Sequence, residues 1–345
     1  MAATNKRPPK HQLSDLYQMQ SLPLNAKERM TNSRIREWYE KFDGDVYFSY
    51  SGGKDSTALL ELVARFCKTY GYKLIVRYCN TGLEYPEVRS FAKKNIIRLE
   101  KLYGIDIDFD ELRPEMIFRD VIINYGYPII SKEVSKIVYG ARHSKKKKQS
   151  YINKLDGLNP DFTVSEYKKQ YKKYKILLKA PFEISNRCCY QMKERPLIAF
   201  ERERRVKPIV ATMAEESRQR LQGWIKSGCN AFDAKRPMSK PISFWTEQDV
   251  LNFLYKNEIP IAGVYGTIQE KGELPGQTFL PGFCNELCCS GCERTGCIFC
   301  AYGAHLDKGT TRFQRLKETH NKLWNYCIGG ESTTLMEYGN HQKAV

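Results

Sequence analysis

A glycine loop at residues 51–57 constrains the fold of this chain more than any other feature. Its sequence is Ser51-Gly52-Gly53-Lys54-Asp55-Ser56-Thr57, and a β-prone run at 45–50 precedes it. Apolar residues then recur every three or four positions from Leu59 to Tyr70, which predicts a helix with one buried face. We therefore expect a strand, a tight turn and a helix in succession.

Such a loop suits a phosphate group. Two glycines leave the backbone N–H groups open to an anion, and the N-terminus of the helix adds its positive dipole. Lys54 supplies a mobile positive charge, and Ser51, Ser56 and Thr57 supply hydroxyl donors. The four-residue spacer of a Walker A loop is missing. The alternative is an ordinary turn between a strand and a helix.

Strand-like and helix-like segments alternate around this loop. β-prone runs occur at 72–79, 105–109 and 206–210, and a helical pattern covers 86–103. This alternation predicts an α/β fold with a doubly wound, mostly parallel sheet. Ligands of such sheets bind at the carboxyl ends of the strands, which is where the glycine loop lies.

We expect three regions along the chain. Residues 1–40 form a basic N-terminal arm and a helix, and residues 41–230 form the α/β domain that contains the phosphate-binding glycine loop. A basic insertion at 132–179 interrupts that domain. Residues 231–345 form a small, cysteine-rich region that carries a metal cluster.

The composition narrows the choice of partner and compartment. A net charge of +17 suggests a polyanionic partner or substrate, with a solvated basic surface as the alternative. Because no run of 18 apolar residues occurs and the first residues are polar and basic, we expect a soluble, cytoplasmic protein. Twelve cysteines in that compartment favour metal or redox chemistry over disulfides.

Much of the charge lies in the basic insertion. It holds 14 Lys/Arg against 4 Asp/Glu, which is +10 of the net charge. Four lysines run from Lys145 to Lys148, and tyrosines are interleaved with the lysines from Lys168 to Lys175. These tyrosines are Tyr167, Tyr171 and Tyr174. The pattern suits phosphate contacts and base stacking in a nucleic acid. A solvated insertion without a ligand is an equal alternative.

A second polar turn follows the strand expected at 72–79. It has the sequence Asn80-Thr81-Gly82-Leu83-Glu84, and Pro86 then suits the first turn of a helix. Gly82 permits a tight turn, and the polar groups face the same crevice as the glycine loop. Glu84 and Asp55 are candidates for contacts to a metal ion or a ribose.

Three further segments carry polar or cysteine-rich patterns. The first begins Asn186-Arg187-Cys188-Cys189 and continues to Lys193 and Pro196-Leu197. The second, at 211–220, offers the phosphate-binding candidates Glu216, Ser217, Arg218 and Arg220. The third, at 240–260, contains Lys240-Pro241-Ile242, Trp245, Asp249-Val250 and Ile259-Pro260.

In this order, the motifs resemble those of the phosphoadenosine phosphosulfate (PAPS) reductase family, over roughly residues 45–300. The glycine loop resembles the pyrophosphate loop (PP-loop) of the adenine nucleotide α-hydrolase-like superfamily. The resemblance implies binding of ATP or a sulfated adenylate and chemistry on the α-phosphate side. The chain is most similar in character to PAPS-reductase-like enzymes of DNA phosphorothioation and to PAPS reductase domain proteins of mobile elements.

Two departures from the family pattern bear on the chemistry. Ala211 and Met213 stand where the family often has Gly and Arg, so one phosphate-binding cation is lost, while Arg218 and Arg220 remain. The tail motif Glu-Cys-Gly-(Leu/Ile)-His of assimilatory reductases is missing, and the surroundings of Cys327 do not match it. This departure counts against a simple reduction to sulfite.

Six cysteines crowd 17 residues, namely Cys284, Cys288, Cys289, Cys292, Cys297 and Cys300. Thiolates at this spacing suit an iron–sulfur cluster or Zn²⁺. The resemblance implies a [4Fe–4S] cluster, because APS reductases bind one with an adjacent cysteine pair and a later C-x-x-C. Matched by motif, its ligands are Cys188, Cys189, Cys297 and Cys300. A local site of Cys288, Cys292, Cys297 and Cys300 competes with this assignment.

Three functions fit these features. The first is a PP-loop ATP pyrophosphatase that activates a target, a nucleic acid above all, for sulfur transfer from a donor or partner protein. The loop amides and Lys54 would then bind the leaving pyrophosphate, and Mg²⁺ would neutralise the charge as it develops. Asp55 is the second catalytic candidate, through a contact to the metal ion or the ribose. The second is a sulfonucleotide (APS or PAPS) reductase. The third is a nucleotide-sensing or nucleic-acid-binding protein without turnover.

Overall fold

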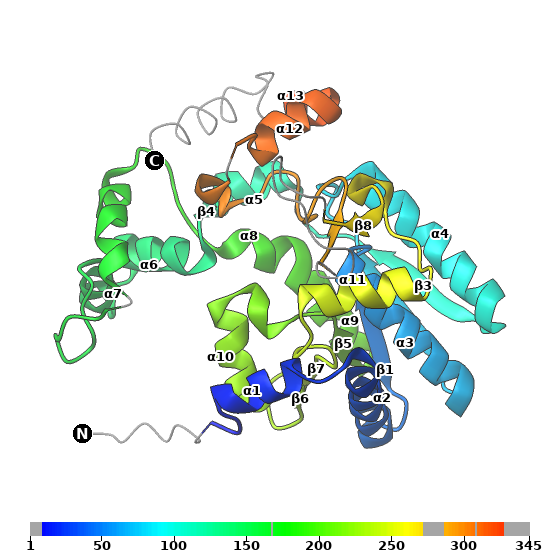
Figure 1. Ribbon diagram of the computed structural model, residues 1–345. Coiled ribbons are helices and arrows are strands. Elements are labelled where there is room, and N and C mark those ends of the chain that lie inside the picture. The colour runs from blue at the N-terminus through cyan, green and yellow to red at the C-terminus, as the bar shows by residue number, and fades with distance from the viewer. Residues whose placement is uncertain (1–8, 167, 272–285, 308, 328–345) are drawn as a thin grey trace, which may run out of the picture. The chain divides into compact units, whose positions relative to one another are not determined.

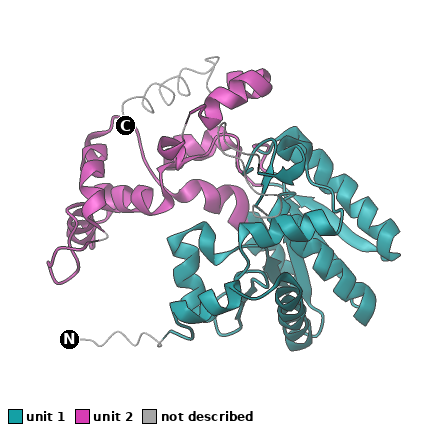
Figure 2. Cartoon of the chain, viewed as in Figure 1, with its two compact units in different colours: residues 1–80, 84–113, 196–295 teal, residues 81–83, 114–195, 296–345 magenta. Residues whose placement is uncertain are grey.

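The computed structural model describes residues 9–166, 168–271, 286–307 and 309–327 (Figure 1). Cys284 and Tyr167 lie outside the described residues, as does the sequence that follows Cys327. The chain divides into two compact units (Figure 2). Unit 1 comprises residues 1–80, 84–113 and 196–295, and unit 2 comprises 81–83, 114–195 and 296–345.

Unit 1 is built on a six-stranded sheet with the order β3-β2-β1-β5-β7-β6. Its strands are β1 (Val46–Tyr50), β2 (Leu74–Cys79), β3 (Ile107–Leu112), β5 (Lys207–Val210), β6 (Asn230–Ala231) and β7 (Met238–Ser239). Neighbouring strands are parallel except β6 and β7, which are antiparallel. The predicted α/β fold with a mostly parallel sheet is therefore confirmed.

Helices and a hairpin complete unit 1. The helices are α1 (Leu13–Gln20), α2 (Leu24–Lys41), α3 (Lys54–Tyr70), α4 (Pro86–Tyr103), α9 (Arg195–Arg204, which starts at the boundary), α10 (Arg218–Ser227) and α11 (Glu247–Lys256). Two short 3-10 turns are η3 (Ala214–Glu216) and η4 (Gly263–Tyr265), and β8 (Ile268–Glu270) pairs antiparallel with β9 (Leu287–Cys289).

The sheet of unit 1 is covered on both faces, because side chains of β1 alternate between two layers. Phe48 and Tyr50 belong to the main core, which also contains Trp38 of α2 and Leu59 of α3. Tyr47 belongs to a separate cluster with Phe200 of α9. This two-sided burial is the mark of a doubly wound sheet.

Glycines define both ends of α3. Gly53 is its N-cap, and Gly71 is its C-cap in the left-handed conformation, with φ at 73°. A left-handed C-cap favours glycine because a side chain there would clash with the backbone. The glycine loop thus leads directly into the first turn of a helix whose apolar face is fully buried.

Unit 2 is mostly helical. It contains α5 (Phe118–Tyr125), α6 (Lys132–His143), α7 (Lys148–Leu155), the 3-10 helix η1 (Lys168–Lys179), α8 (Arg187–Cys189), the π-helix η2 (Tyr190–Glu194), the turn η5 (Ala304–Leu306), α12 (Arg312–Thr319) and α13 (Asn321–Cys327). β4 (Ile129–Ile130) and β10 (Ala301–Tyr302) form a parallel pair. None of the helices described is long and apolar enough to cross a membrane.

The basic insertion forms α6, α7 and η1, and its tyrosines face inward. Tyr171, Tyr174 and Leu177 recur every third residue and are all buried. A 3-10 helix has three residues per turn, so this spacing places them on one face. Tyr171 and Tyr174 therefore belong to the core of unit 2, and the base-stacking role suggested for them by the sequence is wrong.

Candidate nucleotide and metal-cluster sites

The glycine loop lies where β1 ends and α3 begins. Gly52 has φ at 70°, and a Cβ atom there would lie 2.8 Å from Val88 Cγ1 and 2.9 Å from the Val88 carbonyl oxygen. Only glycine fits at this position. The loop is held in shape by its own hydroxyls, since Ser56 and Thr57 both donate to the Gly53 carbonyl at 2.9 Å.

Two amides at the start of α3 are weakly bonded. Gly53 N–H donates to Ser51 Oγ and Lys54 N–H donates to the Tyr265 hydroxyl, each at 3.4 Å. Ordinary N–H···O bonds are shorter, near 3 Å. Stronger acceptors such as phosphate oxygens can therefore replace these hydroxyls at a helix N-terminus.

Lys54 is buried beside this loop, with 5% of its surface exposed. Its ammonium group forms an ion pair with Glu247 and donates to the Glu293 carbonyl at 2.8 Å. It also lies 5.9 Å from the centre of the Tyr265 ring. Glu247 is half exposed at the first position of α11. A carboxylate thus occupies the contact that an anionic ligand would make with Lys54.

Asp55 follows Lys54 on the first turn of α3. Burial raises the pKa of its carboxyl group, and the nearby Lys54 ammonium opposes this effect. Its Oδ1 atom is buried and has no hydrogen-bond partner among the described residues. An unpaired buried carboxylate oxygen costs free energy, so a donor or a cation from a ligand would stabilise it.

The polar turn after β2 is divided between the units. Asn80 belongs to unit 1, where its amide donates to Glu111 at 3.0 Å, and Glu84 also belongs to unit 1. Thr81 and Gly82 belong to unit 2. In that unit the Leu83 carbonyl accepts a hydrogen bond from Ile298 N–H at 2.8 Å, between Cys297 and Cys300 in sequence.

The candidate phosphate ligands at 216–220 surround a carboxylate. Glu216 forms ion pairs with Arg220 and, at 3.4 Å, with Arg294. The Ser217 side chain caps α10 by accepting a bond from Arg220 N–H at 3.3 Å, and the exposed Arg218 follows it as the first residue of α10. Two guanidinium groups thus lie beside one carboxylate in unit 1.

Four cysteines line one cavity of unit 2. They are Cys188, Cys189, Cys297 and Cys300, and the other lining residues include Phe118, Met192, Phe299 and Tyr302. Cys188 and Cys189 end the short helix α8, and the π-helix η2 follows at once. Cys297 and Cys300 lie at the two ends of a turn, which is closed by a 2.9 Å hydrogen bond from Cys300 N–H to the Cys297 carbonyl.

The chemistry of this cavity fits a soft metal centre. Burial raises the pKa of the Cys300 thiol to about 11, and burial together with neighbouring thiols raises that of Cys188 further. The Tyr302 hydroxyl is buried there without a hydrogen-bond partner among the described residues. The neighbouring Ser135 hydroxyl already donates to the Ile129 carbonyl at 2.7 Å. Thiol donors in an apolar lining suit iron–sulfur clusters and zinc.

The four sulfurs share a cavity but are not drawn together as a ligand set. In the part of the chain that the structure describes, no three His, Cys, Asp or Glu side chains are grouped closely enough to hold a metal ion. Cys288 and Cys292 lie in unit 1, whereas Cys297 and Cys300 lie in unit 2. Neither unit by itself therefore contains the competing local set.

Cys289 lies near the glycine loop within unit 1. It ends β9, and the residues that follow it include Glu293, which contacts Lys54. Burial raises the pKa of its thiol, and the Lys54 ammonium lowers it. The sequence grouped Cys289 with the other cysteines because the spacing of cysteines carries no sign of where the units divide.

Sequence reasoning also missed Glu247, Tyr265 and Thr295 around Lys54. Glu247 was detectable in part, because Thr246 and Asp249 form a capping box that places a helix N-terminus at this point. Tyr265 and Thr295 contact each other near Gly53, and they are 30 residues apart in the sequence. No local pattern reveals such a contact.

Part of the chain matches a known family model. The model of the phosphoadenosine phosphosulfate reductase domain matches residues 141–302. An uncharacterised protein of Methanocaldococcus jannaschii is 35% identical over 105 residues, which are 30% of this chain and 20% of that protein. The chain thus spans about a fifth of the length of this relative.

Among solved structures, the U34-tRNA thiolase NcsA from Methanococcus maripaludis with its [4Fe–4S] cluster is similar, with a TM-score of 0.33 and 14% identity. That match covers 69% of this chain and 66% of the thiolase chain. The resemblance indicated by the motifs is confirmed by the domain match, which extends over residues 141–302.

Proposed function

We propose that this chain is a PP-loop ATP pyrophosphatase that activates a nucleic acid for sulfur transfer. The observation that carries the proposal is the buried Lys54 ammonium beside the glycine loop, held by oxygens that a polyphosphate can replace. The match of residues 141–302 to the phosphoadenosine phosphosulfate reductase domain supports an enzyme of the sulfur-transfer or sulfonucleotide-reductase kind.

In the first step an oxygen of the nucleic acid attacks the α-phosphorus of ATP. The bond between that phosphorus and the oxygen that bridges to the β-phosphate breaks, and pyrophosphate leaves with the electron pair. Lys54 and the amides at the start of α3 bind the leaving pyrophosphate, where negative charge increases in the transition state. Asp55 offers its unpaired oxygen to Mg²⁺ or to a ligand hydroxyl.

In the second step a sulfur nucleophile, such as hydrosulfide, displaces AMP from the activated position. Cys188, Cys189, Cys297 and Cys300 would hold the [4Fe–4S] cluster, since they line one cavity. When bound, such a cluster supplies electron transfer or a site for binding sulfur. The cavity around these thiols is lined mainly by apolar groups, and Lys193 also lines it.

The nucleic-acid acceptor is supported by unpaired positive charge in unit 2. Lys145, Lys146, Lys147 and Lys148 are all exposed, and none of them forms an ion pair with another described residue. By contrast, Lys169 pairs with Glu166 and Lys175 pairs with Asp156. Free lysines are the groups that bind phosphates and release counterions.

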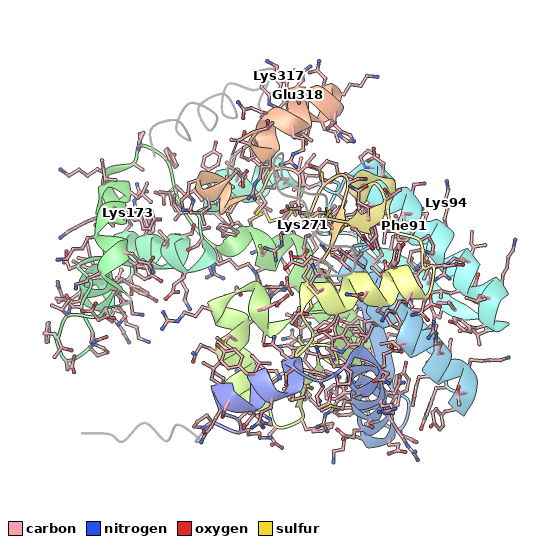
Figure 3. All side chains as sticks on the ribbon, in the orientation of Figure 1. Phe91, Lys94, Lys173, Lys271, Lys317 and Glu318 are labelled. Atoms are coloured by element: carbon pink, nitrogen blue, oxygen red, sulfur yellow. The ribbon has the colours of Figure 1, made fainter. Side chains whose placement is uncertain are left out.

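Product analysis tests this function. Anaerobically purified protein is supplied with ATP, Mg²⁺, sulfide and nucleic acid, and pyrophosphate, AMP and sulfur incorporation are measured. We expect a Lys54→Ala variant to release pyrophosphate about 10²–10³-fold more slowly, as when one electrostatic donor is removed from an active site. Lys94→Ala, on the exposed face of α4 (Figure 3), is the matched control. Unchanged turnover in Lys54→Ala contradicts the proposal.

A sulfonucleotide reductase is the second candidate, and the position of Cys289 favours it. A reductase needs a thiol near the nucleotide, and Cys289 lies close to the Lys54 ammonium; burial raises the pKa of this thiol, and the ammonium opposes that rise. The thiolate would attack the sulfate sulfur and form an S–S bond, releasing AMP from APS or adenosine 3′,5′-bisphosphate from PAPS, and an external thiol would then release sulfite. Sulfite from APS or PAPS that disappears in Cys289→Ser would establish this reaction instead.

A further inference from the structure

Phe162 is an exposed aromatic residue in a backbone conformation that disfavours it. Its side chain lies in the basic insertion of unit 2, with 67% of its surface exposed. Its φ angle is 65°, in the left-handed region. Bulky residues other than glycine are outliers there, and large apolar side chains usually lie inside.

The hairpin that carries Phe162 is well ordered by its own hydrogen bonds. Phe162 N–H donates to the Asn159 carbonyl at 3.1 Å, and Asn159 N–H donates to the Thr163 carbonyl at 2.8 Å. The Asp161 carboxylate accepts from the Thr163 hydroxyl at 2.7 Å. Leu158 and Val164 form an antiparallel bridge at the base. The turn therefore fixes Phe162 at the tip, pointing away from the core of its unit.

Glycine or asparagine normally occupies such a left-handed position in a hairpin. Phenylalanine there gains nothing from burial, because most of its surface is exposed. A strained residue that contributes so little to packing points to a function outside the fold.

One lysine contacts the base of this hairpin, and further exposed lysines lie on the neighbouring elements. The Lys168 ammonium donates to the Leu158 carbonyl at 3.3 Å and to Asn159 Oδ1 at 3.1 Å, which ties the hairpin to the start of η1. Lys172 and Lys173 are exposed on the same helix, and Figure 3 labels Lys173 there. The exposed run of Lys145 to Lys148 leads into α7, which packs against η1.

We propose that Phe162 stacks on an unpaired base of a nucleic acid whose phosphates bind Lys145 to Lys148 and the exposed lysines of η1. The proposal rests on the proposed function and identifies how its acceptor is held. Aromatic residues within basic surfaces bind single-stranded nucleic acids in this way, because every base offers a π-face. Phe162 takes the role that the buried Tyr171 and Tyr174 cannot fill.

The test uses the full chain and fluorescein-labelled oligonucleotides of about 20 nucleotides, as single-stranded DNA, single-stranded RNA and duplex DNA. Affinity is measured by anisotropy over a series of salt concentrations. Phe162→Gly removes the ring and suits the left-handed backbone, so its melting temperature should equal or exceed that of the wild type. We expect its affinity for single strands to fall about 5- to 150-fold, the range for one stacked base.

Two variants complete the series. Phe162→Trp should retain the affinity, because it keeps a stacking surface. Ile117→Ala removes an apolar side chain that is 61% exposed in the same unit but outside the insertion, and it should bind as the wild type does. A fluorescent 2-aminopurine base in the single strand should be quenched by the wild type and not by Phe162→Gly.

The outcomes separate this inference from the proposed function. If replacing Lys145 to Lys148 by glutamine weakens binding and lowers its salt dependence, while Phe162→Gly binds as the wild type does, the stacking role is overturned and the acceptor proposal stands. If the wild type binds none of the probes at low salt, both are overturned. If Phe162→Gly binds more weakly and also melts at a lower temperature than the wild type, the residue has a structural role and the stacking role is overturned.

Discussion

Substitution of Gly52 by alanine tests the requirement for glycine in the loop at 51–57. Gly52 has a left-handed φ of 70°, which disfavours any side chain. A Cβ atom at this position would also lie 2.8 and 2.9 Å from two atoms of Val88. Gly71, at the other end of α3, has a φ of 73° and nothing within 4 Å of its Cβ position. The two glycines differ in steric surroundings and share the same backbone strain.

The difference can be expressed as free energy. In Gly71→Ala the folded state is destabilised only by the left-handed conformation, by about 1–2 kcal/mol. In Gly52→Ala the same strain is present, and the clash with the Val88 carbonyl adds about 1–3 kcal/mol, the usual cost of overpacking. We therefore expect unfolding free energies lowered by roughly 1–2 kcal/mol for Gly71→Ala and 2–5 kcal/mol for Gly52→Ala.

Urea denaturation followed by circular dichroism measures these differences, and calorimetry with a non-hydrolysable ATP analogue measures nucleotide binding. Gly52→Ala should lose the nucleotide, since relief of the clash with Val88 moves the amides that bind phosphate. Gly71→Ala should keep it. Equal destabilisation of the two variants, or full nucleotide affinity in Gly52→Ala, would refute the reasoning.

Three more predictions follow from ion pairs and thiols. Glu247→Gln should raise the affinity for an ATP analogue several-fold in calorimetry, because it removes the carboxylate that pairs with the buried Lys54 ammonium; a loss of affinity would contradict this. Cys188→Ser should lose iron and sulfide after anaerobic purification whereas Cys288→Ser keeps them, and the reverse pattern would favour the local set. Lys27→Met breaks a pair with Asp249 whose members are 3% and 13% exposed, so it should lower the unfolding free energy by about 3–5 kcal/mol; a change below about 1 kcal/mol, as for an exposed pair, would contradict the expectation.

The sheet could be predicted from the sequence because local patterns specify it. The runs at 45–50, 72–79 and 206–210 contain β1, β2 and β5, and the helical pattern at 86–103 coincides with α4 (Pro86–Tyr103). β3 begins and ends two to three residues later than its predicted run. Strand and helix periodicity, turn glycines and Pro86 are all signals within a few residues of one another.

The arrangement of the sites was less predictable, because it depends on distant contacts. Nothing between Cys292 and Cys297 in the sequence marks the division between the two units. Tyr171 and Tyr174 are buried together because η1 is a 3-10 helix with three residues per turn. A search for the α-helical period of 3.6 residues does not detect this spacing. The glycine loop marks Lys54 as a candidate phosphate ligand, whereas its pairing with Glu247 joins positions 193 residues apart and has no local signal.

The cavity that the four cysteines share also has a consequence for biosynthesis. Its two pairs of thiols are contributed by segments at 188–189 and 297–300. A ribosome that adds about 5–20 residues per second needs roughly 5–20 s to synthesise the sequence between them. During that time the first pair is open to oxidation or to capture by stray metal ions. The β4–β10 pairing that joins the two segments of unit 2 can form only after Tyr302 has left the ribosome, so the cavity lined by the four cysteines is complete only after both segments have been translated.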